Sequence, residues 1–90
     1  MNAVYKTLDQ MFPHEEGVFV GVDGGMGAMR RLHAMGLHEG QGLRVLCRQP
    51  ARGPVVVQIG GRMTIAIGRG LARRLRVRVQ PHTESGRVRS

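Results

Sequence analysis

Short stretches in which apolar and polar residues alternate cover most of this chain and predict strands. Alternation places every second side chain on the same face of a strand, and β-branched residues favour extended backbone. Glycine, proline and aspartate separate these stretches, which is typical of short strands joined by tight turns. The predicted strands cover residues 18–22, 43–49, 54–59, 63–67 and 75–79.

The loop between the predicted strands 54–59 and 63–67 determines how these two strands pair. A two-residue loop of Gly60 and Gly61 would place Ile59 opposite Arg62 and would mix apolar with polar faces. A three-residue loop that includes Arg62 keeps the inward pairs apolar, and we predict this loop, with a glycine bulge. It pairs Ile59 with Met63, Val57 with Ile65, and Val55 with Ile67.

A short helix is predicted for residues 27–35, between the first two strands. Its apolar side chains recur every three residues and therefore share one face. The two arginines that precede the last turn, Arg30 and Arg31, fall on the other side. The apolar face, which we expect to pack on the strands, consists of Met29, Leu32 and Met35.

The end of this helix is the most specific local prediction. Gly36 can adopt the left-handed conformation that ends a helix, because it has no Cβ to clash there. In a Schellman ending, the residue after the glycine commonly contacts a residue of the last helical turn, so we expect Leu37 to touch Leu32. Gly40 then allows a tight turn before the next strand.

Five short strands around an aliphatic core predict a mainly β fold, a small five-stranded SH3-like barrel that is closed or nearly closed. One short α-helix lies between its first and second strands, and one helical turn precedes the last strand. We expect the domain to span residues 18–80. Residues 1–17 form a lead-in that packs on the barrel through Leu8, Met11 and Phe12, and residues 81–90 form a polar tail.

The net charge of +8 is distributed unevenly along the chain. Residues 1–43 carry three basic and five acidic residues, a net charge of −2, whereas residues 44–90 carry eleven arginines and one glutamate, a net charge of +10. A basic half favours an anionic partner such as nucleic acid, lipid headgroups or an acidic protein face. Arginines on the solvated faces of strands would equally keep a small protein soluble.

No stretch resembles a signal peptide or approaches the ~20 apolar residues of a membrane span, so we expect a cytoplasmic protein. The single cysteine, Cys47, cannot form an internal disulfide. It falls on the same face of its predicted strand as Leu43 and Val45, which predicts a buried apolar side chain and not a ligand or nucleophile. A buried cysteine is badly placed for nucleophilic catalysis, and we expect no enzymatic activity.

The histidines are weak candidates for a metal site. A firm Fe²⁺ site needs something like two histidines and a carboxylate that converge on open positions. His33, His38 and Glu39 are close in sequence, but no two ligands are four residues apart on the helix, and the other candidates are scattered: His14, His82 and Cys47. We predict no resident cofactor, and a site of two histidines and a carboxylate is the kind that would suit Fe²⁺.

A nucleic-acid-binding barrel is an alternative that the basic half of the chain suggests. Small barrels that bind RNA or DNA usually add aromatic side chains on which bases stack. None of Tyr5, Phe12 and Phe19 lies among the outward arginines of the predicted strands, which disfavours this alternative. The arginines expected on outward faces are Arg44, Arg48, Arg62, Arg76 and Arg78. An anionic membrane surface is a milder alternative partner.

Several short motifs resemble the FeoA family, the small cytoplasmic proteins of bacterial ferrous iron uptake. The most specific is an Arg-Leu-x-x-Met-Gly-Leu-x-x-Gly stretch that begins at Arg31 and ends at Gly40. The resemblance covers roughly residues 7 to 79, one domain in length. The other matching segments are Gly53-Pro54-Val55, Ile65-Ala66-Ile67, Ala72 and Leu75-Arg76-Val77.

The resemblance implies an SH3-like fold, no enzymatic activity and a protein partner. That partner is the cytosolic GTP-binding region of FeoB, a membrane protein that carries Fe²⁺. The chain would then be a cytoplasmic accessory or regulatory protein that reaches the inner face of the membrane through FeoB. A related domain makes protein contacts in some iron-dependent repressors, so a metal-responsive regulatory domain is a further alternative.

The exposed polar side chains at the end of the helix and in the following loop are our prediction for the partner-binding surface. They are Arg30, Arg31, His33, His38 and Glu39. The residues that we expect to hold them in place are Leu32, Met35, Gly36, Leu37 and Gly40. A simpler interpretation is that these polar groups only solvate and cap the helix.

Overall fold

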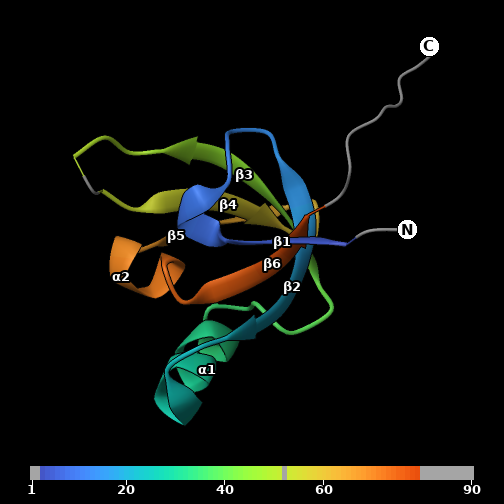
Figure 1. The fold of residues 1–90 in the computed structure, drawn as a ribbon, viewed down its shortest axis with the longest axis vertical. Coiled ribbons are helices and arrows are strands. Elements are labelled where there is room, and N and C mark those ends of the chain that lie inside the picture. The colour runs from blue at the N-terminus through green and yellow to red at the C-terminus, as the bar shows by residue number, and fades with distance from the viewer. Residues whose placement is uncertain (1–2, 52, 80–90) are drawn as a thin grey trace.

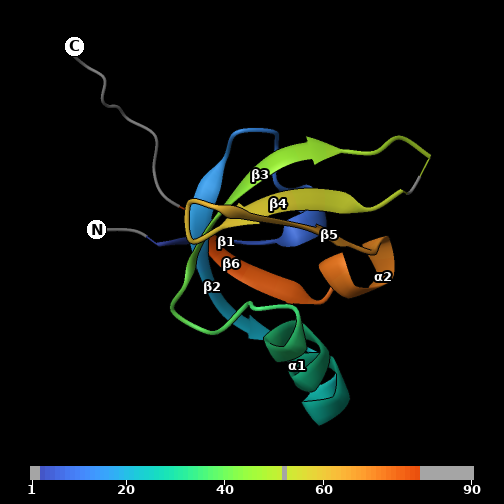
Figure 2. The same cartoon turned by 180° about the vertical axis from the view of Figure 1, so that it is seen from behind.

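The computed structural model describes residues 3–51 and 53–79, which form one antiparallel sheet with short helices beside it (Figure 1 and Figure 2). The strand order across the sheet is β1-β6-β2-β3-β4-β5. The strands are β1 (Val4–Thr7), β2 (Glu16–Val22), β3 (Gly42–Arg48), β4 (Val55–Ile59), β5 (Met63–Ile67) and β6 (Leu75–Val79). The helices are the 3-10 turn η1 (Leu8–Gln10), α1 (Gly25–Ala34) and α2 (Arg69–Ala72).

The predicted mainly β fold with a short helix is confirmed, but the predicted five-stranded barrel, closed or nearly closed, is wrong in strand number and in closure. The sheet has six strands, and it is not closed, because β1 and β5 lie at its two edges. The strand that the prediction missed is β1, which pairs with β6 and has only four residues. Two polar residues follow two apolar ones in β1, so no alternation identifies it as a strand. Part of the lead-in therefore belongs to the sheet.

The aliphatic core lies against the inward positions of the strands and is covered by η1 and α2. Within the predicted lead-in, Leu8 and Met11 are fully buried, whereas Phe12 is 62% exposed. The prediction for Phe12 is wrong because the backbone is extended at Met11, so consecutive side chains point to opposite sides. The predicted helical turn before the last strand is α2, and it buries Leu71 and Ala72.

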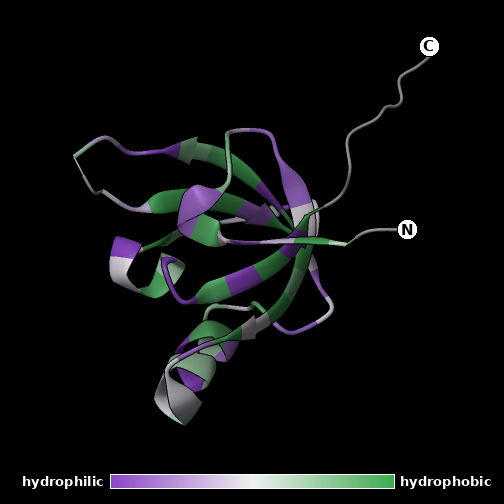
Figure 3. Ribbon diagram, in the orientation of Figure 1, coloured by the Kyte–Doolittle hydropathy of each residue, from purple (hydrophilic) through white to green (hydrophobic). Residues whose placement is uncertain are grey.

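The alternation predicted for the last strand is confirmed in β6, where the three apolar residues are buried and both arginines are exposed. Figure 3 shows this alternation as green and purple bands along the strand. The β4–β5 pairing is also confirmed, since Ile59 lies opposite Met63 and Val57 opposite Ile65. Gly60 and Gly61 both have positive φ, 63° and 77°, a conformation that glycine adopts without strain.

Strand β3 contains a bulge that moves Cys47 to the surface. Val45 pairs with Val57, but the next paired residue of β3 is Cys47, opposite Val56, so Leu46 is an extra residue in the ladder. Such a bulge shifts the inward face by one residue. Cys47 is exposed, and the prediction that it is buried is wrong.

Candidate functional site

Helix α1 stands away from the sheet and contacts the core mainly near its C-terminal end (Figure 1). Leu32 is its one buried residue, and Met29 is only partly buried against the core. Met26 is 72% exposed. The helix begins at Gly25, two residues before the predicted start. The predicted apolar face is present, but only its C-terminal part is covered by the rest of the chain.

The end of α1 is a Schellman ending, as predicted. Gly36 has φ of +96°, in the left-handed region. Its N–H donates to the His33 carbonyl over 3.0 Å, and the Leu37 N–H donates to the Leu32 carbonyl over 3.0 Å. This pair of nested hydrogen bonds defines the motif. Leu32 and Leu37 are both fully buried, so the helix end is fixed to the core.

The turn after the helix is attached to strand β2. Gly40, at φ of +87°, donates its N–H to the Phe19 carbonyl over 2.8 Å. Phe19 in turn donates its N–H to the Gln41 carbonyl over 3.0 Å, and the Gln41 side chain accepts from the His38 N–H over 3.1 Å. Phe19 is fully buried. The turn is therefore held by backbone hydrogen bonds to a buried strand residue.

Three of the five predicted partner-binding side chains come together at this end of the helix. His33 Nε2 and Glu39 Oε1 are 3.0 Å apart, and the rings of His33 and His38 lie with their centroids 4.7 Å apart. The cluster stays exposed to solvent. Arg30 and Arg31 are exposed on the same helix and have no acidic partner within the residues that the structure describes. We call these five residues, Arg30, Arg31, His33, His38 and Glu39, the helix-end surface.

The carboxylate of Glu39 is stabilised in its charged form. A hydrogen bond from its own backbone N–H is the main reason that its pKa lies below the usual value of 4.5. The hydrogen bond to His33 lowers the pKa further, and the positive charges that His33 and His38 can carry add a smaller effect. Burial acts in the opposite direction and does not reverse the shift.

A metal site is not supported by the described residues. Across residues 3–51 and 53–79, no group of three or more His, Cys, Asp or Glu side chains is arranged to hold a metal ion. His33 Nε2 faces the Glu39 carboxylate, and the His38 ring lies on the His33 ring, so these groups contact one another. His82 lies outside the described residues, and His14 and Cys47 do not join the cluster.

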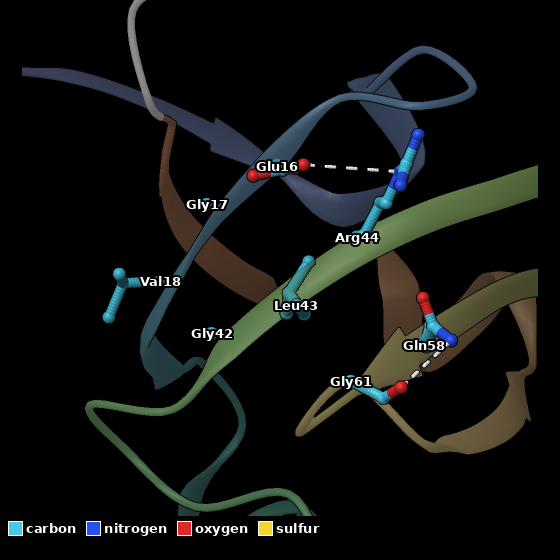
Figure 4. Close-up of a pocket in the computed structure, with 8 residues that line it drawn as sticks. All are labelled: Glu16, Gly17, Val18, Gly42, Leu43, Arg44, Gln58 and Gly61. Carbon is cyan, nitrogen blue, oxygen red and sulfur yellow. Dashed lines mark hydrogen bonds and ion pairs between the residues drawn. The ribbon is translucent and has the colours of Figure 1, made fainter.

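A shallow hollow of about 330 Å³ lies where β2, β3 and the β4–β5 loop meet (Figure 4). The sequence prediction missed it. Glu16 and Arg44 form a loose ion pair at its rim, with 4.0 Å between Oε2 and Nε, and the Gln58 amide donates to the Gly61 carbonyl over 3.3 Å. The residues around it are Glu16, Gly17, Val18, Gly42, Leu43, Arg44, Gln58 and Gly61.

Glycine is the only sequence signal for this hollow. Gly17 cannot carry a side chain, because a Cβ there would come within 2.7 Å of the Arg78 carbonyl oxygen and would also collide with Val77. Gly17 pairs with Leu43, and the next pair, Val18 with Gly42, contributes only one side chain. Gly17 and Leu43 are both buried, so it is Gly42 that leaves the outer surface of the sheet without a side chain opposite Val18.

The prediction that no aromatic residue lies among the arginines is wrong for Tyr5. Tyr5 is directly opposite Arg78 in the β1–β6 ladder, and Arg78 is opposite Val18 in the β6–β2 ladder. Tyr5 is 59% exposed. The error follows from the missed strand β1, because only pairing with β6 brings Tyr5 beside the arginines.

The fold and the helix-end surface define a small SH3-like β domain with an appended helix that exposes polar side chains. A protein-family model described as the FeoA domain matches residues 6–79. This chain belongs to the FeoA family. Over the part of the chain that the structure describes, no helix has the length and apolar character needed to cross a membrane.

Individual relatives agree with the family. A protein of Methanocaldococcus jannaschii, provisionally named Fe(2+) transport protein A, is 44% identical over 63 residues, which is 70% of this chain and 73% of the relative. The crystal structure of an iron uptake regulatory protein (FeoA) matches with a TM-score of 0.78 and 38% identity, and the match covers 86% of this chain and all of that one. A manganese-dependent transcriptional repressor shares the fold at a TM-score of 0.77 and 20% identity, over 89% of this chain and 44% of the repressor.

Proposed function

We propose that this protein is a non-enzymatic accessory or regulatory protein of ferrous iron uptake that acts by contact with the cytosolic part of the transporter FeoB. Membership of the FeoA family supports the process. The observation that supports a docking role is the fixed backbone of the helix-end surface, which the Schellman ending and the Gly40–Phe19 hydrogen bond hold in place. The protein would work at the cytoplasmic face of the membrane, where its partner is located.

A fixed polar surface suits specific docking for two reasons. Side chains whose backbone is already ordered lose less conformational entropy when a partner binds. Exposed charges at the rim of an interface mainly increase the rate of association and exclude wrong partners. Arg30 and Arg31 would therefore orient an acidic surface of the partner toward the helix end, and the His33–Glu39 pair would add hydrogen-bonding groups.

Titration calorimetry with the purified cytosolic GTP-binding region of the FeoB of the same organism tests the proposal. The double variant Arg30→Glu with Arg31→Glu should weaken binding by about tenfold, because it reverses two charges that face the partner. Arg48→Glu is the matched control, since Arg48 is equally exposed at the far end of β3 and should leave binding unchanged. Absence of binding by the folded wild-type protein would contradict the proposal.

A nucleic-acid-binding function is the second candidate, and one observation favours it. Tyr5, Arg78 and Val18 form a row across β1, β6 and β2, so one aromatic ring lies beside an exposed arginine after all. Stacking on such a ring and contacts to phosphates would give binding that falls steeply with salt. Fluorescence anisotropy with random single-stranded DNA at low salt measures this, and a flat titration excludes this candidate.

A metal-responsive domain is the remaining alternative, although no group of three or more His, Cys, Asp or Glu side chains in the described residues is arranged to hold a metal. Anaerobic calorimetry with Fe²⁺ would show saturable heat if His33, His38 and Glu39 bound the metal. We expect none, since the imidazole of His33 already faces the Glu39 carboxylate at 3.0 Å.

A further inference from the structure

Strand β5 is an open edge of the sheet. The sheet ends at β1 on one side and at β5 on the other. Among the described elements, only β4 packs along the length of β5. Its ladder with β4 runs through all five residues without a bulge, whereas the β2–β6 and β3–β4 ladders are both irregular. A regular edge of this kind presents a row of backbone N–H and C=O groups that an extended chain can pair with.

The composition of β5 does not protect this edge. Natural edge strands are commonly kept from pairing by lysine, proline, bulges or a short length. Strand β1 follows this rule, because it has four residues and carries Lys6, whose ammonium group is 3.0 Å from a Glu15 oxygen. Strand β5 has neither a charged residue nor a proline, since it reads Met-Thr-Ile-Ala-Ile. The two edges of the same sheet are therefore built differently.

The side chains of β5 leave the edge accessible. Thr64 and Ala66 are exposed, Ile65 is half-buried, and Met63 is 47% exposed. The methyl group of Met63 lies 3.1 Å from the position that a Cβ of Gly36 would occupy. The beginning of β5 is therefore continuous with the end of α1, where the helix-end surface lies.

We propose that β5 receives an extended segment of a protein partner as a seventh strand. Strand addition takes its affinity from main-chain hydrogen bonds and its specificity from alternate side chains. Small or β-branched residues in the segment would fit beside Thr64 and Ala66, and an acidic residue at one end would pair with Arg62, which is exposed at the start of the edge. This inference deepens the proposed function, on which it rests for the expectation of a protein partner.

A second copy of this chain fits the edge less well. Antiparallel pairing of two copies about Ile65 would place Arg62 of each copy beside Gly68 and Arg69 of the other. Each copy also carries a net charge of +8, so like charges would repel during association. The net charge of the chain and the exposed Arg62 before β5 therefore favour a neutral or acidic strand of another protein.

The test uses a synthetic peptide, Glu-Glu-Val-Thr-Val-Thr-Val-Glu-Glu, titrated into the full-length protein labelled with nitrogen-15. We expect saturable amide shifts concentrated at residues 62–67, and slower hydrogen exchange there, with a dissociation constant at or below about 1 mM. A control peptide with proline at the central valine should produce no shifts. Shifts centred on β1, or none at all, would overturn the proposal. A dimer that forms without peptide and protects β5 from exchange would also overturn it, because the second copy would then be the occupant.

Two variants test whether the peptide binds at the β5 edge. Thr64→Pro puts a residue without an N–H into the edge and should abolish binding. Because this variant can fail to fold, Arg62→Glu gives an independent measurement, and it should weaken binding about threefold by repelling the acidic end of the peptide. Arg78→Glu, on β6 at the other side of the sheet, is the matched control and should change affinity less. Equal effects of Arg62→Glu and Arg78→Glu would overturn the placement on β5.

The proposed function and this inference can fail separately. If the peptide binds β5 but the FeoB region does not bind the protein, the proposed function fails and the strand-receiving edge stands. If the FeoB region binds and the peptide does not, the proposal that β5 receives a strand fails and the proposed function stands.

Discussion

The two ends of helix α1 are held in different ways. At the C-terminal end, Leu32 and Leu37 are fully buried, and the N–H groups of Gly36 and Leu37 close the last turn with two hydrogen bonds. At the N-terminal end, the cap residue is Gly24, which provides no side-chain hydrogen bond, and no acidic residue lies in the first turn. Met26 in that turn is 72% exposed.

This difference shows that packing fixes only the C-terminal end of α1 to the rest of the domain. Most helical stability in proteins comes from the packing of an apolar face, and only the C-terminal end has such packing. The N-terminal end has weak helix formers, with glycine at two of its first three positions. The packed end therefore fixes the helix-end surface in space, whereas the N-terminal end depends on its own propensity.

The largest expected effect is at the packed end. Leu32→Ala should lower the free energy of unfolding by about 2–5 kcal/mol, because it removes a fully buried side chain and leaves a cavity. Met26→Ala is the control at the free end, and it should change stability by less than about 0.5 kcal/mol. Urea unfolding followed by circular dichroism measures both. Similar losses for the two variants would show that the ends are not held differently.

A smaller loss is expected at the glycine that closes the helix. Gly36→Val should cost about 1–3 kcal/mol, because a β-branched residue is strained at φ of +96° and would press on Met63. Gly36→Asn should cost less, since asparagine tolerates the left-handed conformation better. Thermal unfolding ranks the two, and an unchanged melting temperature for the valine variant would refute the role of Gly36.

The parts of the fold that the sequence predicted depend on local signals. The register of β4 with β5 follows from counting the loop residues, and the end of α1 follows from one glycine after an apolar spacing. The parts that it missed depend on distant contacts. Strand β1 is a strand because β6 is available beside it, and no residue type marks the bulge at Leu46 that exposes Cys47.

The candidate site divides in the same way. The exposure of Arg30, Arg31 and His33 could be predicted, because polar residues on one side of an amphipathic helix face solvent. The contact of His33 with Glu39 could not, because it requires the chain to leave the helix at Gly36 and the turn over residues 38–41 to bring a residue six positions later back to the helix. The hollow beside Gly17 and the open edge of β5 depend on strand order, which periodicity does not determine.

A moderate gain in stability is expected at the free end. Gly27 lies inside α1, and nothing lies within 4 Å of the position where its Cβ would be. Gly27→Ala should therefore raise the free energy of unfolding by up to about 1 kcal/mol, through helix propensity alone. Gly25→Ala should not be stabilising, because Gly25 has φ of +81°. If Gly27→Ala lowers the melting temperature, the N-terminal end has contacts that its exposure does not indicate.

The smallest expected effect is a dependence on pH at the packed end. The pKa of Glu39 is lowered in the folded state, first by the hydrogen bond from its own backbone N–H and then by the bond to His33. A carboxyl whose folded pKa is below its unfolded value stabilises the fold when it is ionised. Its contribution is therefore fully present above the usual value of 4.5 and is lost as the pH falls through the lowered pKa. Melting temperatures of wild type and Glu39→Gln should differ slightly near neutral pH and converge in acid, and a difference that grows in acid would contradict the assignment.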